Sequence, residues 1–206
     1  MKTGFEELDN IIGSLNNGEL TCIASRPGIG KTTLAIDIVN NVTNKTNDRI
    51  LFISLENSKD FFENKIKNDK VEIITDKLFI NEIENICREL YSTYKNISLI
   101  VIDYLQLIKN ETNDNLNETI DIIKTLKQLS IDLNTHIIIT SQLPRLNNEE
   151  PALEHLNIHG TSYYYHNVLL LHKDNENKIK IEVAKNIPNK FVVLEFNNKN
   201  LSFNEN

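Results

Sequence analysis

The segment "LTCIASRPGIGKTTLAIDIV", residues 20–39, decides the fold because its character changes twice along its length. Residues 20–24 form an apolar run of the kind that builds a buried strand, and Lys31 to about Val42 has the apolar spacing of a helix. The turn between them contains two glycines and leads into Gly-Lys-Thr. This order of strand, glycine-rich turn and helix is the template of a phosphate-binding loop.

The chemistry of this turn predicts a nucleotide site. Small residues let consecutive backbone N–H groups point inward at phosphate oxygens, and the positive end of the following helix adds to the attraction. We expect Lys31 to neutralise the β- and γ-phosphates and the Thr32 hydroxyl to bind Mg²⁺. An ordinary strand–helix turn is the alternative, and Ser25 stands where the template usually has glycine or alanine. The predicted nucleotide-binding residues are Ser25, Arg26, Pro27, Gly28, Ile29, Gly30, Lys31, Thr32 and Thr33.

Strand-like apolar runs alternate with helical patterns through residue 140, as in a parallel α/β sheet. Further strands are predicted at 49–56, 97–103 and 136–140, and we place 97–103 at the sheet centre because it is the most continuous apolar run. Helices are predicted after the cap Ser58, from the N-cap Asn81 through Tyr94, and over about 116–134.

The pattern changes after the polar loop "PRLNNEEP". The short strand patterns "NVLLLH", "KIKIEVA", "FVVLEF" and "NLSF" follow in succession, with residues 197–200 as a hairpin turn. The predicted fold class is therefore α/β, with a mostly parallel central sheet flanked by helices and a C-terminal antiparallel strand extension. We expect one domain over residues 1–206.

The composition limits which partners the protein is expected to bind and in which compartment it is expected to lie. The net charge of −7 argues against a general electrostatic attraction to nucleic acid, although it leaves room for local cationic contacts. The two cysteines, Cys22 and Cys87, lie in apolar periodic segments and are predicted to be buried thiols in a reducing environment. The N-terminus has no apolar core of a signal peptide, and no apolar run is long enough to cross a bilayer. We therefore expect a cytoplasmic protein.

Three further residues have the form of a nucleotide-hydrolysing site. Asp103 closes the apolar run "ISLIVID", which is the pattern of the acid that helps to hold magnesium in such sites. Glu56 ends the strand pattern "LFISLE", and a carboxylate there is suited to activate the attacking water; a surface carboxylate at a strand end is the alternative. Gln142 follows "HIIITS" and is a neutral donor suited to sense the γ-phosphate.

Five stretches in order, "TGFEELD", "IASRPGIGKTTLA", "FISLENS", "LIVIDYLQLI" and "IIITSQLPR", resemble the C-terminal RecA-like motor domain of DnaB-type replicative helicases. "VAKN" also fits, so the similarity runs over nearly the whole chain. It implies a RecA-like P-loop fold, ATP and Mg²⁺ as ligands, a homo-oligomeric ring such as a hexamer, single-stranded DNA in its channel, contacts with other replication proteins, and no membrane.

The resemblance also implies roles by position. Lys31 and Thr32 match the Walker A pair, Asp103 matches the Walker B acid, and both Thr32 and Asp103 are then metal ligands. Glu56 matches the carboxylate that activates water, and Gln142 matches the residue that couples the γ-phosphate to the DNA-facing loop. The candidate catalytic residues are therefore Glu56, Lys31 and Gln142.

At the end of the chain the motif departs from the family pattern. Lys185 matches a lysine that reaches the nucleotide of a neighbouring subunit. Two residues further on, where the family has an arginine finger, stands Ile187. Such a finger is worth about 10³–10⁵-fold in rate in related phosphoryl-transfer enzymes, and isoleucine cannot supply its charge. Arg145 or Lys190 is a candidate substitute.

Other departures concern the DNA-facing loop and the length of the chain. The family loop reads like Leu-Arg-Glu-Ser-Gly, whereas residues 156–160 read "LNIHG", with Asn157 and Ile158 in place of the charged pair and Gly160 retained. Three tyrosines, 163–165, follow, and packing or a subunit contact is favoured over stacking on bases. Relative to the family, the sequence starts without the N-terminal helical domain and its linker helix, and the stretch from Glu56 to Asp103 is short.

Three functions fit these features. The first is an ATP-hydrolysing, DnaB-like motor on single-stranded DNA, favoured by the intact set of nucleotide-site residues. The second is a nucleotide-binding accessory or regulatory relative with weak or no motor activity, favoured by the missing finger, the neutral loop and the acidic charge. A recombinase-type relative of the same fold ranks last, because "DYLQLI" does not fit it.

Overall fold

The computed structural model describes residues 1–110, 118–144, 150–156, 158–175, 178–186, 190–197 and 202–205, and no side-chain placement is described for residues 158–160 and 175. One mixed sheet of nine strands runs through the molecule, in the order β3-β2-β4-β5-β1-β6-β7-β8-β9. The strands are β1 (Leu20–Ser25), β2 (Arg49–Ser54), β3 (Val71–Ile74), β4 (Ile97–Asp103), β5 (His136–Gln142), β6 (Asn167–Asn175), β7 (Lys178–Lys185), β8 (Lys190–Asn197) and β9 (Ser202–Asn204).

The strands β1 to β6 are parallel to one another, and β7, β8 and β9 continue the sheet in antiparallel pairing. This confirms the predicted mostly parallel sheet with an antiparallel C-terminal extension. The parallel strands all direct their carboxyl ends to one edge of the sheet, which is where ligands bind in open α/β folds.

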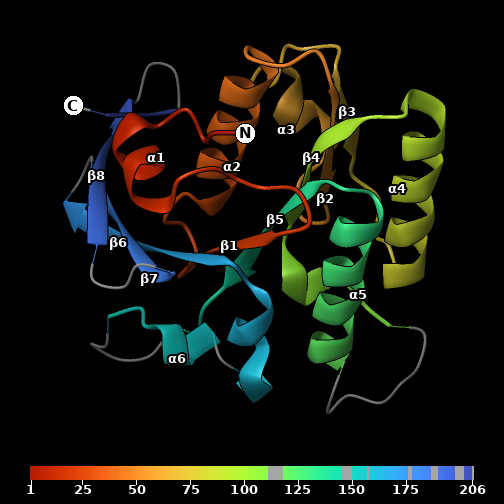
Figure 1. The fold of residues 1–206 in the computed structure, drawn as a ribbon. Coiled ribbons are helices and arrows are strands. Elements are labelled where there is room, and N and C mark those ends of the chain that lie inside the picture. The colour runs from red at the N-terminus through yellow and green to blue at the C-terminus, as the bar shows by residue number, and fades with distance from the viewer. Residues whose placement is uncertain are drawn as a thin grey trace.

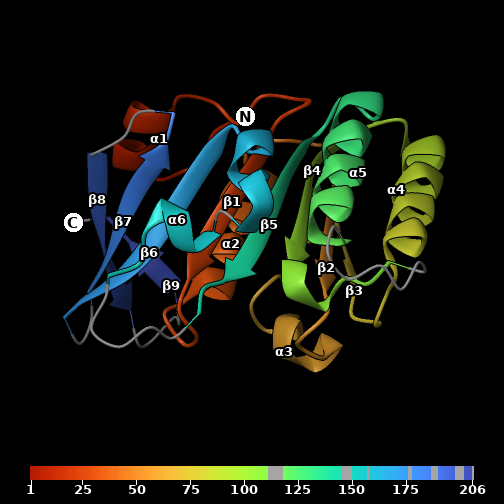
Figure 2. The same cartoon turned by 90° about the horizontal axis from the view of Figure 1, so that it is seen from below.

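Helices cover both faces of the sheet (Figures 1 and 2). They are α1 (Glu6–Ile12), α2 (Lys31–Thr43), α3 (Lys59–Glu63), α4 (Ile80–Tyr94), α5 (Glu118–Asp132) and α6 (Leu153–Leu156), with 3₁₀ turns η1 (Leu105–Leu107) and η2 (Ile158–Tyr164). Successive apolar side chains of a strand point to opposite faces of the sheet, so they pack in two separate hydrophobic cores. On β1, Ile23 faces the core shared with α1 and α2, whereas Cys22 and Ala24 face the core shared with α4 and α5.

The sequence-based boundaries were right for the long elements and wrong in several details. β4 matches 97–103, but it lies third in the sheet, between β2 and β5, and β1 occupies the middle. β2 ends at Ser54, so Glu56 lies beyond the strand. The N-cap of α4 is Phe79 instead of Asn81, and the Phe79 N–H donates to Glu82 Oε2 at 2.7 Å.

Other elements were not predicted or lie outside the described residues. The sequence pattern did not predict α1, β3, η1, α6 and η2. Ser58 is the N-cap of α3 as expected, and both cysteines are free and buried. The predicted hairpin at 197–200 falls largely outside the described residues. Among the residues that the structure describes, no helix is long and apolar enough to span a bilayer.

Candidate nucleotide-binding site

Residues 25–33, which match the phosphate-loop template, span the connection between β1 and α2 at the carboxyl edge of the sheet. We call them the phosphate-loop segment. Gly28 and Gly30 both have positive φ angles, +78° and +111°, which L side chains rarely adopt. Gly30 is the N-cap of α2, so the loop ends where the helix exposes its unpaired N–H groups. A Cβ atom at Gly28 would meet no described atom within 4 Å, which leaves that side of the loop open in the described part of the chain.

Lys31 lies in the first turn of α2 and is largely buried, with 8% of its surface exposed. Burial lowers the pKa of its ammonium group, and the negative charges of Asp103 and Glu56 act in the opposite direction. The structure therefore brings three of the predicted residues, from three different segments, close enough for their charges to interact. Lys31 is thus a buried cation beside two carboxylates.

Thr32 and Asp103 meet directly. The Thr32 hydroxyl donates to Asp103 Oδ2 at 2.9 Å, and the Thr140 hydroxyl donates to Asp103 Oδ1 at 2.5 Å. Burial raises the pKa of the Asp103 carboxyl, while these two hydrogen bonds and Lys31 oppose that rise. Oxygen donors of this kind suit Mg²⁺, which usually takes one or two protein ligands and completes its shell with phosphates and water.

These donors fit the predicted metal without forming a protein cage. In the described part of the chain no cluster of three or more His, Cys, Asp or Glu residues has metal-binding geometry. A metal here would depend on the phosphates of a nucleotide for most of its ligands.

Glu56 is an exposed residue in the turn after β2. The backbone holds this turn against the end of β4, because Leu55 N–H donates to Asp103 O at 2.7 Å. The carboxylate of Glu56 is near enough to influence the pKa of both Lys31 and Tyr104. Its exposure and its place beside Lys31 allow water to reach it.

Gln142 ends β5 beside the start of the phosphate-loop segment. Its Cα pairs with that of Ser25 in the parallel ladder, and Leu143 N–H donates to Ser25 O at 2.9 Å. A residue that the sequence analysis missed holds this strand end: Gln106 Nε2 donates to Ser141 Oγ and to Gln142 O, and Gln106 Oε1 accepts from Gln142 N–H. The only signal was its place in "DYLQLI", three residues after Asp103.

A cavity of about 300 Å³ opens beside the loop. Its polar rim includes both acidic and basic side chains, and two of its residues belong to the predicted nucleotide site. It is lined by Arg26, Ile29, Glu150, Pro151, Leu171, His172 and Lys173. The phosphate-loop segment therefore borders open space large enough for part of a small ligand.

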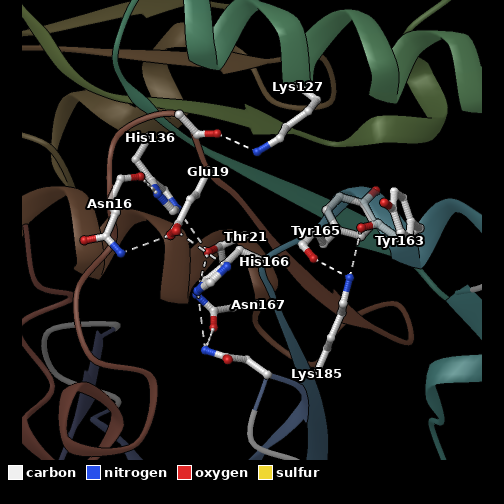
Figure 3. Close-up of polar contacts among 12 residues, drawn as sticks. Asn16, Glu19, Thr21, Lys127, His136, Tyr163, Tyr165, His166, Asn167 and Lys185 are labelled. Atoms are coloured by element: carbon white, nitrogen blue, oxygen red, sulfur yellow. Dashed lines mark hydrogen bonds and ion pairs between the residues drawn. The ribbon is translucent and has the colours of Figure 1, made fainter.

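Lys185 lies elsewhere. It pairs with Val168 near the amino end of β6, at the opposite edge of the sheet from the phosphate loop. Its ammonium group donates to the carbonyl oxygens of Ser162, Tyr163 and Tyr165 at 2.6, 3.0 and 2.5 Å. Figure 3 shows the contacts with the two tyrosines. Burial lowers the pKa of this lysine. Within one chain it is not part of the cluster around Lys31.

The three tyrosines near Lys185 have different surroundings. Tyr163 is 82% exposed, Tyr164 is partly buried, and Tyr165 is buried in the core. Other predictions fall outside the described residues: Arg145, Asn157 and Ile187 are not described, nor are the side chains of residues 158–160. Lys190 is described and exposed at the start of β8.

Known proteins resemble this chain in sequence and in fold. The family model described as "DnaB-like helicase C terminal domain" matches residues 1–78 and 61–205. A "Probable plasmid replicative DNA helicase" of Chlamydia muridarum is 32% identical over 225 aligned positions, covering 90% of this chain and 50% of that protein. "Replicative DNA helicase DnaB" of Geobacillus stearothermophilus is 30% identical over 179 positions, covering 69% of this chain and 39% of that protein.

The alignments also locate a difference in length. The chain spans about half the length of the curated relatives it matches. The first alignment has 225 positions although the chain has 206 residues, so the relative carries residues within the matched region that are missing here. The two segments of the family match overlap at 61–78, between β2 and β4, where the sequence looked short.

Solved structures share the fold. One, described as an "ATPase Domain", superposes with a TM-score of 0.89 at 21% identity, covering 99% of this chain and 90% of that one. A structure of a DnaB-like replicative helicase superposes with a TM-score of 0.87 at 23% identity, covering 99% and 61%. The RecA-like arrangement expected from the sequence is therefore confirmed. Because the family model matches most of its length, the chain belongs to the DnaB-like helicase C-terminal domain family.

Proposed function

We propose that this chain binds ATP with Mg²⁺, hydrolyses the γ-phosphate, and acts on single-stranded DNA in replication as one subunit of a homo-oligomeric ring. The observation that carries the proposal is the convergence of Lys31, Thr32 and Asp103 at the start of α2 and the end of β4. Relatives described as replicative DNA helicases support a role in replication, and one solved relative is described with its interactions with primase.

The residues of the loop would hold the phosphates. The N–H groups in the first turn of a helix have no carbonyl partner within it, so those of α2 can donate to phosphate oxygens. The Lys31 ammonium group would offset the negative charge of the terminal phosphates. Thr32 Oγ1 and Asp103 Oδ2 would hold the metal, which when bound neutralises charge on the phosphate oxygens.

Glu56 would orient the attacking water and accept its proton. This role is supported by the exposed position of Glu56 beside Lys31, where a carboxylate can reach a water molecule next to a bound γ-phosphate. Gln142 would respond to the γ-phosphate and pass its presence to the loop that follows β5, because Gln106 and Ser25 tie the end of β5 to two other parts of the site.

The test is ATP hydrolysis with and without a single-stranded oligonucleotide. Lys31→Ala should lower the rate by about 100-fold or more, and Glu56→Gln should lower it by about 100-fold while leaving ATP binding in place. Lys124→Ala and Glu89→Gln, which change exposed residues of the same types on α5 and in the second half of α4, are the matched controls and should keep the wild-type rate.

Two outcomes count against the proposal. Unchanged hydrolysis in Lys31→Ala would refute the site itself. Tight ATP binding by the wild type, with slow turnover that DNA does not stimulate, would replace the motor with an accessory, nucleotide-binding role.

A further inference from the structure

The last described strand lies directly against the phosphate loop. β9 is an edge strand of the sheet, and the Phe203 ring is buried, with 5% of its surface exposed. A Cβ atom at Gly30 would lie 2.8 Å from Phe203 Cζ and 3.1 Å from Cε2. The ring therefore touches the backbone of the residue that begins α2 and directly precedes Lys31. The last described strand therefore packs against the loop that we propose binds the nucleotide.

This strand is fixed at three points. Phe203 N–H donates to Asp37 Oδ2 at 2.8 Å, and Asp37 belongs to the same helix as Lys31. The Phe203 ring packs on Phe196 of β8, with the centroids 5.3 Å apart. Beyond the strand, the Glu205 carboxylate accepts hydrogen bonds from the first two N–H groups of α1, at 2.6 and 2.7 Å. Few arrangements of β9 satisfy all three contacts together.

We propose that Phe203 is a positioning residue for the phosphate loop, and that β9 thereby sets the affinity of the site for a nucleoside di- or triphosphate. The inference rests on the proposed nucleotide binding. Gly30 has no side chain to hold it in place, and glycine adopts many backbone conformations. The ring limits this freedom on one side of the loop, so less conformational entropy is lost when phosphate binds.

The contact is confined to the half of the loop that carries Lys31. Among the described residues, a Cβ atom at Gly28 would meet nothing within 4 Å, whereas one at Gly30 would meet Phe203 alone. Replacing the ring should therefore affect the groups that hold the terminal phosphates more than the adjoining cavity beside Arg26 and Ile29.

Coupling of this kind is reciprocal, which gives a test on the unaltered chain. If β9 favours the phosphate-binding form of the loop, nucleotide must favour the docked form of β9 by the same factor. Hydrogen exchange of the wild type, measured with and without Mg²⁺-ADP, should show slower exchange at Phe203 N–H when ADP is bound. The opposite edge strand, β3, serves as the internal control and should not change.

Substitutions separate positioning from stability. Phe203→Ala should raise the KM for ATP by about tenfold with a smaller change in kcat, and Phe203→Leu should recover part of that loss. Phe196→Leu is the matched control, because Phe196 packs on the same ring but is not among the described residues within 4 Å of the Cβ position at Gly30. It should lower the midpoint of thermal unfolding and change KM much less than Phe203→Ala does, because the Phe203 ring is still present beside Gly30.

The outcomes are distinct. Equal KM for Phe203→Ala and the wild type, or equal KM changes in the Phe203 and Phe196 variants, would overturn the positioning role while hydrolysis that depends on Lys31 upholds the proposed function. ADP binding without slower exchange in β9 would overturn it even if Phe203→Ala does not fold. A wild type that binds no nucleotide would overturn both.

Discussion

Asp37 is a buried carboxyl on the helix that follows the phosphate loop. Burial raises its pKa from 3.8 to about 7, against the lowering effects of the Phe203 N–H group and the charge of Lys65. Between about pH 4 and 7 the folded chain then holds a proton that the unfolded chain has released. The free energy of unfolding should therefore fall as the pH rises through this window, by up to about 1.4 kcal/mol per pH unit.

Asp37→Asn should remove this dependence, because asparagine keeps an acceptor for Phe203 N–H and does not titrate. Urea denaturation at about pH 5 and about pH 8 measures the difference on either side of the shifted pKa. Asp121→Asn, at an exposed position on α5, is the control that should behave as the wild type. An Asp37→Asn variant that loses as much stability as the wild type between the two conditions would contradict the assignment.

At the level of single residues, the positions of the motif residues were easier to predict from the sequence than the partners that they contact. Thr32 and Asp103 are 71 residues apart and were paired correctly, because each belongs to a motif whose place in the fold is known. Thr140 and Gln106 were missed. Nothing near Thr140 signals the carboxylate that it contacts, and the place of Gln106 in "DYLQLI" does not reveal which strand end it contacts. The contact of Phe203 with Gly30 depends on how nine strands are ordered, which local pattern does not encode.

The first residue of β5 is a buried histidine at the amino edge of the sheet (Figure 3). His136 is fully buried; its Nδ1 lies 2.8 Å from Asn16 O and its Nε2 lies 3.0 Å from Thr21 Oγ1. Because a carbonyl only accepts, Nδ1 carries the proton and Nε2 accepts from the hydroxyl. Burial lowers the pKa of His136 to about 4, with the Asn16 hydrogen bond acting against it.

This histidine should make the chain sensitive to acid. Between pH 6.5 and about 4 the unfolded chain takes up a proton that the folded chain does not, so the free energy of unfolding should fall as the pH drops. His136→Gln keeps a donor and an acceptor without titrating, and should have a smaller loss between about pH 7 and about pH 4.5 in thermal unfolding followed by circular dichroism. His155→Gln, in α6, is the control; equal acid loss in the wild type and His136→Gln would contradict the assignment.

Elements were predictable where the pattern was long. The spacing of apolar residues gave α2, α4 and α5 and the strands β1, β4 and β5. The four residues of β3 and the seven of α1 are too few to establish a period, and both take their structure from packing on neighbours. The start of α4 moved to Phe79 because the Glu82 carboxylate caps its N–H, so a side chain within the helix overrode the preference of Asn81 for a cap.

Across the whole molecule the sheet separates Lys31 from Lys185, two residues that were expected from the sequence to act on one nucleotide from neighbouring subunits. The loop that carries Lys31 is at the carboxyl edge of the parallel strands, and Lys185 is at the amino edge. One chain therefore cannot bring both lysines to the same phosphate without a large rearrangement. Two chains can do so if the carboxyl edge of one lies beside the amino edge of the other. To reach a neighbour's phosphate, the Lys185 ammonium group must exchange some of its three carbonyl partners.

If the site is shared between copies, two inactive variants should restore activity when mixed. Lys31→Ala has an intact Lys185, and Lys185→Gln has an intact loop, so a mixed ring contains some interfaces with both wild-type groups. Each variant alone should hydrolyse ATP slowly, and the mixture should recover activity that neither shows, in proportion to the fraction of mixed interfaces. Glutamine at 185 keeps a donor for the carbonyls of η2, which limits the damage to that turn.

The same mixture distinguishes the alternatives through its mass. Light scattering with ATP and an oligonucleotide should give a mass of several chains of 23.7 kDa for the wild type and for the mixture. Assembly without recovered hydrolysis would exclude Lys185 as a shared group and leave the ring intact. A single-chain mass together with full wild-type hydrolysis would mean that the site is complete within one chain, and Lys185 would then serve only to hold η2.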